Sequence, residues 1–248
     1  MARRMFSRLL IGLLLGLGLW TNAGAAEPSK LILALGDLSY MSPDAVRAWT
    51  NAEARNELGD RELLEFAVVI LSNVPYAAVP ADVQERLPEF VSKGGSLLIT
   101  GGPNSFGSGG YQAIAPLVPF EFRGTDDWHA FPFKAVFPLQ KNHPFFQGVT
   151  FRVMGTFNDL NPKPGATILA EYAGGRVATG AAFFQSPLIN EQQVGQGIVI
   201  GVAFDLGREV NGWIDGNRFV RNVIVYLVDR SPLTPKPEEE KEGEGSQR

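Results

Sequence analysis

Hydrophobic and polar positions alternate in blocks along the first half of the chain. Three short apolar runs, at residues 30–37, 66–74 and 96–100, contain few polar side chains. Their length and continuity predict strands that are buried on both faces of a sheet. The two segments between them, residues 42–58 and 80–95, place apolar side chains at helical spacing. Because strands and helices alternate with short connections, this half predicts a right-handed parallel βαβαβ unit.

The two predicted helices carry residues that are typical of helix ends. Ser42 or Asp44 can cap the first helix, with Pro43 in its first turn. Gly94 is the expected C-terminal cap of the second helix. Pro88 lies inside this second helix, where a proline removes a hydrogen bond and costs about 3 kcal/mol. We therefore expect a kink or a late helix start at this point.

The second half of the chain has shorter apolar segments. They favour partly antiparallel strands at residues 133–139, 166–172, 176–184 and 186–205, with a tight hairpin turn at residues 193–197. An apolar stripe over residues 217–228 predicts a last helix that packs back on the sheet. The predicted class is α/β, with a mainly parallel sheet and antiparallel strands in the C-terminal half.

Both ends of the chain differ from its centre. Residues 1–25 have a basic start, an apolar stretch of about a dozen residues and a small-x-small cleavage site, which predict a signal peptide rather than a bilayer span of about 20 residues. Residues 232–248 are rich in Pro, Glu, Lys and Gly, and predict a disordered acidic tail. Residues 26–231 remain as one α/β domain. We expect an exported, periplasmic protein whose contact with a membrane, if it has any, is through an uncleaved signal.

Charge and composition mainly exclude functions. Removal of three arginines with the signal leaves 22 − 3 = 19 basic residues against 26 acidic ones, a net charge of −7. No basic cluster is present, so the chain lacks the electrostatic signature of nucleic-acid binding. The absence of Cys excludes cysteine nucleophiles and cysteine metal ligands. No cofactor is predicted, and the expected partner is an unidentified envelope protein or small molecule.

The glycine-rich loop after the third predicted strand, residues 101–111, has features of several known binding and catalytic motifs. Gly102 and Gly107 have the spacing of a phosphate-binding loop, but Ser108 stands where its lysine should be. The dinucleotide fingerprint GxGxxG is absent from the loop. Ser105 and Ser108 both lack the flanking glycines of a Gly-x-Ser-x-Gly nucleophile elbow.

Two other kinds of site are also weakly indicated. His129 and His143 could serve a serine hydrolase only if the fold brought one of them to a Ser or Asp. Asp126, Asp127 and His129 are close in sequence, but their spacing matches no metal-ligand pattern. We therefore predict no catalytic residue and no metal ligand.

The segment FAVVILSNVPYAAVPADVQERLPEFVSKGGSLLITGGPNSFGSGGY, residues 66–111, combines a strand, a helix ending in V-x-x-G-G and the block LLITGGPNSFGSGGY. This segment resembles the glutamine amidotransferase-like domain of bacteria, a relative of the class I glutamine amidotransferases. Residues 142–149, 164–172 and 193–205 resemble later segments of that family. The resemblance covers most of residues 31–227 and implies a flavodoxin-like three-layer α/β/α sandwich.

The resemblance also implies where a glutaminase nucleophile would lie. True amidotransferases hydrolyse glutamine with a Cys on a strand-to-helix elbow, backed by His and Glu. The order of elements puts that elbow near residues 100–103, yet the chain has no Cys. The family likeness therefore implies a fold without the glutaminase reaction.

Polar side chains follow several of the predicted strands. In open α/β sheets, ligands bind at the carboxyl edge of the strands. We expect one crevice at that edge to be lined by Asp37, Asn73, Asn104, Ser105, Tyr111 and Asp205. The alternative is that the glycines only form a tight loop whose N–H groups are satisfied by Asn and Ser. Trp213 could line the same edge or clamp the last helix to the sheet.

The sequence leaves three functions open. The first is a non-catalytic amidotransferase-like protein that binds a ligand or partner protein at the carboxyl edge. The second is a periplasmic hydrolase with a Ser, Asp and His site, which requires Ser105 or Asp205 beside a His. The third is a structural component of an envelope assembly, which an exposed apolar patch would favour.

Overall fold

The computed structural model describes residues 30–130, 135–173 and 187–235. The predicted signal peptide, most of the predicted tail and the predicted strand at residues 176–184 lie outside these residues. The first tail residues belong to the folded domain, because Pro232 lies against Gly94 and Leu233 packs on the core.

An eight-stranded sheet runs through the centre of the domain in the order β2-β1-β3-β4-β12-β11-β10-β7. The first five strands in this order are parallel. They are β2 (Ala52–Arg55), β1 (Lys30–Gly36), β3 (Val68–Ser72), β4 (Ser96–Thr100) and β12 (Gly197–Val202). The parallel βαβαβ prediction is therefore confirmed for the first three predicted strands.

The remaining strands extend the sheet with antiparallel pairs. They are β11 (Pro187–Val194), β10 (Thr167–Ala173) and β7 (Ala135–Pro138). Gly195, with φ 59°, forms the tight turn between β11 and β12, as predicted. Two small two-stranded sheets pair β5 (Phe120–Phe122) with β9 (Leu160–Pro162) and β6 (Trp128–His129) with β8 (Phe157–Asn158).

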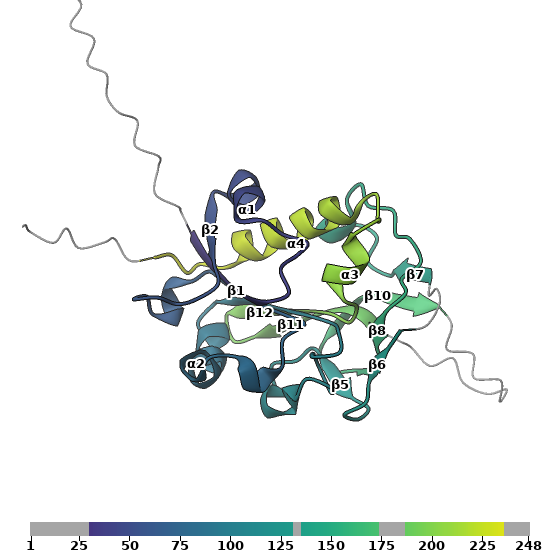
Figure 1. Ribbon diagram of the computed structural model, residues 1–248, viewed down its shortest axis with the longest axis horizontal. Helices are drawn as coiled ribbons and strands as arrows, with labels where there is room; N and C mark the ends of the chain where they lie inside the picture. The colour runs from purple at the N-terminus through teal and green to yellow at the C-terminus, as the bar shows by residue number, and fades with distance from the viewer. Residues whose placement is uncertain (1–29, 131–134, 174–186, 236–248) are drawn as a thin grey trace, which may run out of the picture.

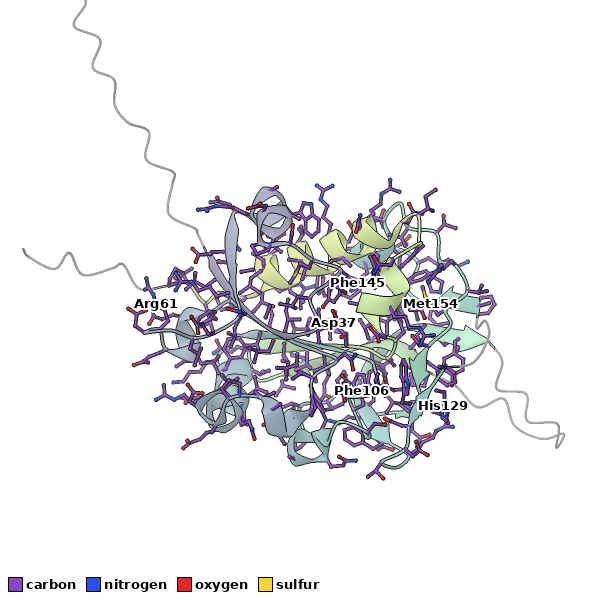
Figure 2. All side chains as sticks on the ribbon, viewed as in Figure 1. Asp37, Arg61, Phe106, His129, Phe145 and Met154 are labelled. Atoms are coloured by element: carbon purple, nitrogen blue, oxygen red, sulfur yellow. The ribbon has the colours of Figure 1, made fainter. Side chains whose placement is uncertain are left out.

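Helices lie on both sides of the large sheet (Figure 1). On one side are α1 (Pro43–Thr50), α3 (Leu206–Val210) and α4 (Gly216–Arg230), and on the other is α2 (Ala81–Ser92). Phe145 lies on the α4 side of the sheet and Phe106 on the opposite side (Figure 2). Short 3₁₀ helices occupy the connections: η1 (Leu63–Glu65), η2 (Tyr76–Ala78), η3 (Tyr111–Ile114) and η4 (Pro144–Phe146).

The first predicted helix ends earlier than the sequence pattern suggested. Ser42 caps α1 by accepting a hydrogen bond from Ala45 N, but the helix stops at Thr50. Asn51 adopts a left-handed conformation with φ 56° and turns the chain into β2. The prediction of helix up to residue 58 was therefore wrong. Residues 52–55 instead form the edge strand β2, and its pairing with β1 outweighs the weak helical stripe.

Helix α2 begins at Ala81 and continues through Pro88 to Ser92, so the helix does not start late. A proline at this position leaves the carbonyl of Gln84 without its usual N–H donor. The Tyr76 hydroxyl donates to Gln84 O at 3.4 Å. Since Pro88 itself is exposed, its ring meets no core side chain that it could displace.

The last helix is held to the domain by aromatic side chains, which settles the role of Trp213. Its ring stacks on Phe151 at 5.1 Å, and its Nε1 donates to Thr150 O at 2.8 Å. Phe219 of α4 is fully buried and contacts four aromatic rings, those of Phe145, Phe151, Phe204 and Trp213. Trp213 therefore clamps the last helix and does not line the carboxyl edge.

Replacing Phe219 with Ala should lower the free energy of unfolding by about 3–5 kcal/mol, because a large cavity would form between α4 and the sheet. Chemical denaturation followed by circular dichroism measures this change. Ile214→Ala is the matched control, since Ile214 is 94% exposed and its loss should change stability by less than about 0.5 kcal/mol. Equal effects of the two substitutions would contradict this account of the core.

Candidate functional site at the carboxyl edge

The carboxyl ends of the parallel strands bring several of the predicted residues together. Asp37 follows β1, Asn73 follows β3, and Asp205 lies just beyond β12. The Asp37 N–H donates to Ser72 O at 2.7 Å. Asn73 Nδ2 lies 3.5 Å from Asp205 Oδ2. The predicted convergence of strand-end polar groups is therefore present for these residues.

Asn73 connects the strand ends to the glycine-rich loop. Its backbone is left-handed, with φ 44°, a conformation that Asn tolerates better than most residues. Its Oδ1 accepts a hydrogen bond from Asn104 N at 3.0 Å. Asn104 itself is exposed. One side chain thus fixes the loop on one side and faces Asp205 on the other.

Asp37 and Asp205 flank the start of α3. Asp205 caps this helix, and its Oδ1 accepts from Arg208 N at 3.1 Å. Asp37 Oδ1 accepts from Ser39 N at 3.0 Å. A Cβ on Gly207 would lie 2.2 Å from Asp37 Oδ2, so glycine is needed where the helix passes this carboxylate.

The space at the end of β4, where an elbow nucleophile would lie, is already filled. A Cβ on Gly101 would lie 2.7 Å from Asn158 Oδ1, and one on Gly102 would lie 2.2 Å from Asn73 Oδ1. Gly102 also has φ 139°, which other residues rarely adopt. Asn158 holds the turn by accepting from Gly102 N at 2.9 Å. Neither glycine position has room for a reactive side chain.

Thr100, the first residue of the expected elbow, belongs to a buried chain of hydroxyl groups. Its Oγ1 lies 3.0 Å from Ser72 Oγ, which accepts from the Tyr40 hydroxyl at 3.1 Å. All three side chains are buried. Burial raises the pKa of Tyr40, only partly offset by the Ser72 hydrogen bond. Thr100 therefore stabilises the strand ends, and its side-chain partner among the described residues is a hydroxyl group, not a base.

Two predicted ligand-binding residues lie inside the protein instead of at its surface. Ser105 and Tyr111 are fully buried. The Tyr111 hydroxyl donates to Val74 O at 2.9 Å, and its ring packs 5.6 Å from that of Tyr76. Burial raises the pKa of Tyr111, and the nearby Ser105 hydroxyl opposes part of this rise. The sequence did not predict this burial, because buried residues in a loop do not recur at the spacing of a strand or a helix.

Several polar residues around this edge were not predicted from the sequence. Glu209 is buried and accepts from Thr156 Oγ1 at 2.8 Å, from Gly155 N at 3.0 Å and from Arg152 Nη2 at 2.8 Å. Asn158 comes from β8, in a segment with no recognisable motif. The sequence indicated Asp127 only as part of a doubtful metal cluster. The partners of these residues are distant in sequence, so their roles depend on the tertiary fold.

Within the described residues, neither Ser105 nor Asp205 has a histidine as a hydrogen-bond partner, which the hydrolase hypothesis requires. His143 caps η4, and its Nε2 lies 3.5 Å from Glu191 Oε2. His129 packs 5.3 Å from the ring of Phe157. Within the described residues, Ser105 Oγ has no hydrogen bond of good geometry, and the side chain of Asp205 bonds to Asn73 and to the backbone of Arg208. The described residues also contain no group of three His, Asp or Glu that could hold a metal ion.

Comparison with known proteins adds information on the fold. No protein-family model matches the sequence, and no curated protein matches it significantly. Two cytoplasmic proteins of Salmonella typhimurium are similar in structure. The first has a TM-score of 0.63 and 14% sequence identity, and the match covers 79% of this chain and 98% of that protein. The second has a TM-score of 0.61 and 16% sequence identity, and the match covers 79% of this chain and 99% of that protein. A ThuA-like protein of Bacteroides uniformis has a TM-score of 0.52 and 12% identity, over 88% and 98%.

These identities are low enough that the similarities concern the fold alone. They support a mixed α/β domain with a large, mostly parallel sheet and added antiparallel strands. Among the residues that the structure describes, no helix is long and apolar enough to cross a membrane.

Asp205→Asn should stabilise the protein at neutral pH. Burial raises the pKa of Asp205, with further increases from Asp37 and Glu209, against the lowering effect of the Arg208 N–H. A carboxyl with a higher pKa in the folded state costs stability as the pH rises through that range. Asn removes this cost and keeps an oxygen to cap α3.

Chemical denaturation at pH 7 and at pH 4.5 measures the effect. The stability difference between Asp205→Asn and the wild type should shrink at the lower pH, where the carboxyl begins to take up its proton. A variant that is less stable than the wild type at pH 7, or a difference that grows on acidification, would contradict this electrostatic account.

Gly102→Ala should destabilise the protein by more than about 1 kcal/mol, since Ala is strained at positive φ and its methyl would collide with the Asn73 amide. Gly110→Ala is the control, because Gly110 also has positive φ, 80°, but a Cβ there would meet nothing within 4 Å. Thermal unfolding measures the stability of both variants. Gly110→Ala reports the cost of backbone strain alone, and Gly102→Ala reports strain together with the collision. A smaller loss for Gly102→Ala than for Gly110→Ala would refute the close packing.

Proposed function

We propose that the protein is an exported, non-catalytic member of the glutamine amidotransferase-like group, with a flavodoxin-like three-layer α/β/α sandwich. It binds a ligand or a partner protein at the carboxyl edge of its sheet. The proposed export depends on the pattern of residues 1–25.

The order of the parallel strands supports the flavodoxin-like assignment. Counted along the chain, the parallel strands β2-β1-β3-β4-β12 have the order 2-1-3-4-5, which is that of flavodoxin-like sheets. In such sheets ligands bind beyond the carboxyl ends of the strands, beside the switch point between the first and third strands. Asp37 and Asn73 lie directly at that point, after β1 and β3.

The packing of Gly101 and Gly102 is the observation that carries the non-catalytic proposal. The absence of Cys from the sequence already argues against a glutaminase. The packing is independent evidence, because the side chains of Asn73 and Asn158 occupy the positions that a nucleophile on this turn would need. A single substitution to Cys would therefore be insufficient to create the elbow.

The exposure of the strand-end residues supports a binding role for the same edge. Asp37 and Asn73 are partly exposed and Asn104 is exposed, while Asp205 lies almost buried beneath them. Carboxylates and amides of this kind supply the few convergent polar groups that fix a ligand's orientation. Hydrogen bonds to Asn73 and Asn158 hold the backbone of the neighbouring loop in place. This favours a binding surface that is formed before the ligand arrives, without the cost of ordering on binding.

One observation favours the structural alternative. Phe137 on the edge strand β7 and Leu139 just after it are 49% and 44% exposed. Exposed apolar side chains at a sheet edge are typical of contacts with another protein. In this second candidate function, the domain is an assembly element that uses its β7 edge and leaves the carboxyl edge free.

Site-specific photo-crosslinking distinguishes the two functions. A photoreactive amino acid in place of Asn104 should form a crosslinked product in envelope preparations. The same amino acid in place of exposed Glu85 on α2 is the control, and in place of Phe137 it reports the alternative. Products at Phe137 with none at Asn104 would replace the proposed function by the structural one.

Purified protein should also release no ammonia from glutamine above the level of a heat-inactivated sample. Ammonia release that persists after further purification would overturn the non-catalytic proposal.

A further inference from the structure

The N–H groups of the glycine-rich loop are almost all used inside the protein. Gly102 N and Asn104 N donate to side-chain oxygens of Asn158 and Asn73. Other loop amides donate to carbonyls within the loop, as Ser105 N does to Gly102 O and Gly109 N to Ser105 O. Gly107 N and Ser108 N instead point at one carboxylate.

That carboxylate is Asp127, which comes from the loop between β5 and β6. Its Oδ2 accepts from Gly107 N at 2.8 Å, and its Oδ1 accepts from Ser108 N at 2.9 Å. Oδ1 also accepts from Ser108 Oγ at 2.6 Å and from Asn158 Nδ2 at 3.2 Å. Both oxygens of one anion are thus held by adjacent backbone amides, a hydroxyl and an amide side chain.

The backbone of the loop is shaped for this contact. Phe106 adopts φ 49°, an unusual conformation for a large side chain. A left-handed residue in a turn directs successive N–H groups toward one point and forms a concave anion site, or nest. Gly107 follows it, and a Cβ there would lie 2.1 Å from Gly124 O and 2.9 Å from Asp127 Oδ2. Glycine is therefore required for the carboxylate to approach the backbone.

Among the described residues, the nest holds Asp127 without a paired cation. Asp127 is 2% exposed, and no ion pair of Asp127 is seen within the residues that the structure describes. Burial of a carboxylate is unfavourable unless hydrogen bonds satisfy it, and these four donors do so. By contrast, the buried Glu209 pairs with Arg152. The glycine-rich loop and Asn158 thus supply hydrogen bonds to Asp127, where Arg152 supplies a cation to Glu209.

We propose that residues 106–108 form an anion-binding nest with the chemistry of a carboxylate receptor, and that the chain fills it in cis with Asp127. The ligand class of the nest is a carboxylate, since two adjacent N–H groups match its two oxygens. In the folded protein Asp127 excludes any external anion, so the loop offers no free phosphate or nucleotide site. An external carboxylate enters only when the Asp127 side chain is removed or displaced.

Chemical rescue tests this inference. Asp127→Ala should lower the melting temperature by about 4 °C or more, because the four donors lose their acceptor. Sodium formate should then raise the melting temperature of Asp127→Ala in a saturable manner, relative to sodium chloride at equal ionic strength. The wild type should show the same melting temperature in both salts. Equal effects of formate and chloride on Asp127→Ala would overturn the proposal.

Asp126→Ala is the matched control, since Asp126 is the exposed neighbouring carboxylate. It should change the melting temperature little and show no specific response to formate.

A second variant keeps the test decisive if Asp127→Ala does not fold. Asp127→Asn preserves the size of the side chain but replaces one acceptor oxygen with an NH₂ group that faces N–H donors. It should melt below the wild type by about 4 °C or more. If Asp127→Asn is as stable as the wild type, the nest does not require an anion and the inference is wrong.

Discussion

Buried backbone amides must find acceptors, and in this protein that constraint acts most strongly where β4 ends. The turn after β4 and the glycine-rich loop run beside the sheet, where most of their N–H groups are out of reach of water. Three side chains from other parts of the chain, Asn73, Asp127 and Asn158, supply acceptors. Because these side chains approach the backbone directly, Gly101, Gly102 and Gly107 have no room for a Cβ.

The chemistry of the carboxyl edge follows from this packing. A turn whose side-chain positions are filled by Asn73 and Asn158 has no room for a nucleophilic side chain at Gly101 or Gly102. A loop whose anion nest holds Asp127 cannot receive a phosphate. The surface beside α3 remains available to a ligand. There, Asp37 lies close enough to Asp205 to add to the rise that burial causes in the pKa of Asp205. The proposed binding role at this edge rests on this combination.

The sequence predicted those features that depend on local pattern. The apolar runs at β1, β3 and β4, the Ser42 cap and the β11–β12 turn all have short-range signals, and the structure contains them. The convergence of Asp37, Asn73 and Asp205 was also predictable, because parallel strands end at one edge. The strand at residues 52–55 was not predictable, because it depends on pairing with β1. Nor were the burial of Ser105 and Tyr111 or the role of Asp127, which arise from contacts between distant segments.

Amide hydrogen exchange in the purified protein, followed residue by residue by NMR, tests the central claim most directly. Clamping by Asn73, Asp127 and Asn158 predicts that the amides of Asn104, Gly102, Gly107 and Ser108 exchange slowly, at rates comparable with those of the neighbouring strand β4, although they lie in a loop. Exchange of these amides at the rate of an unstructured peptide, while β4 remains protected, would contradict the account.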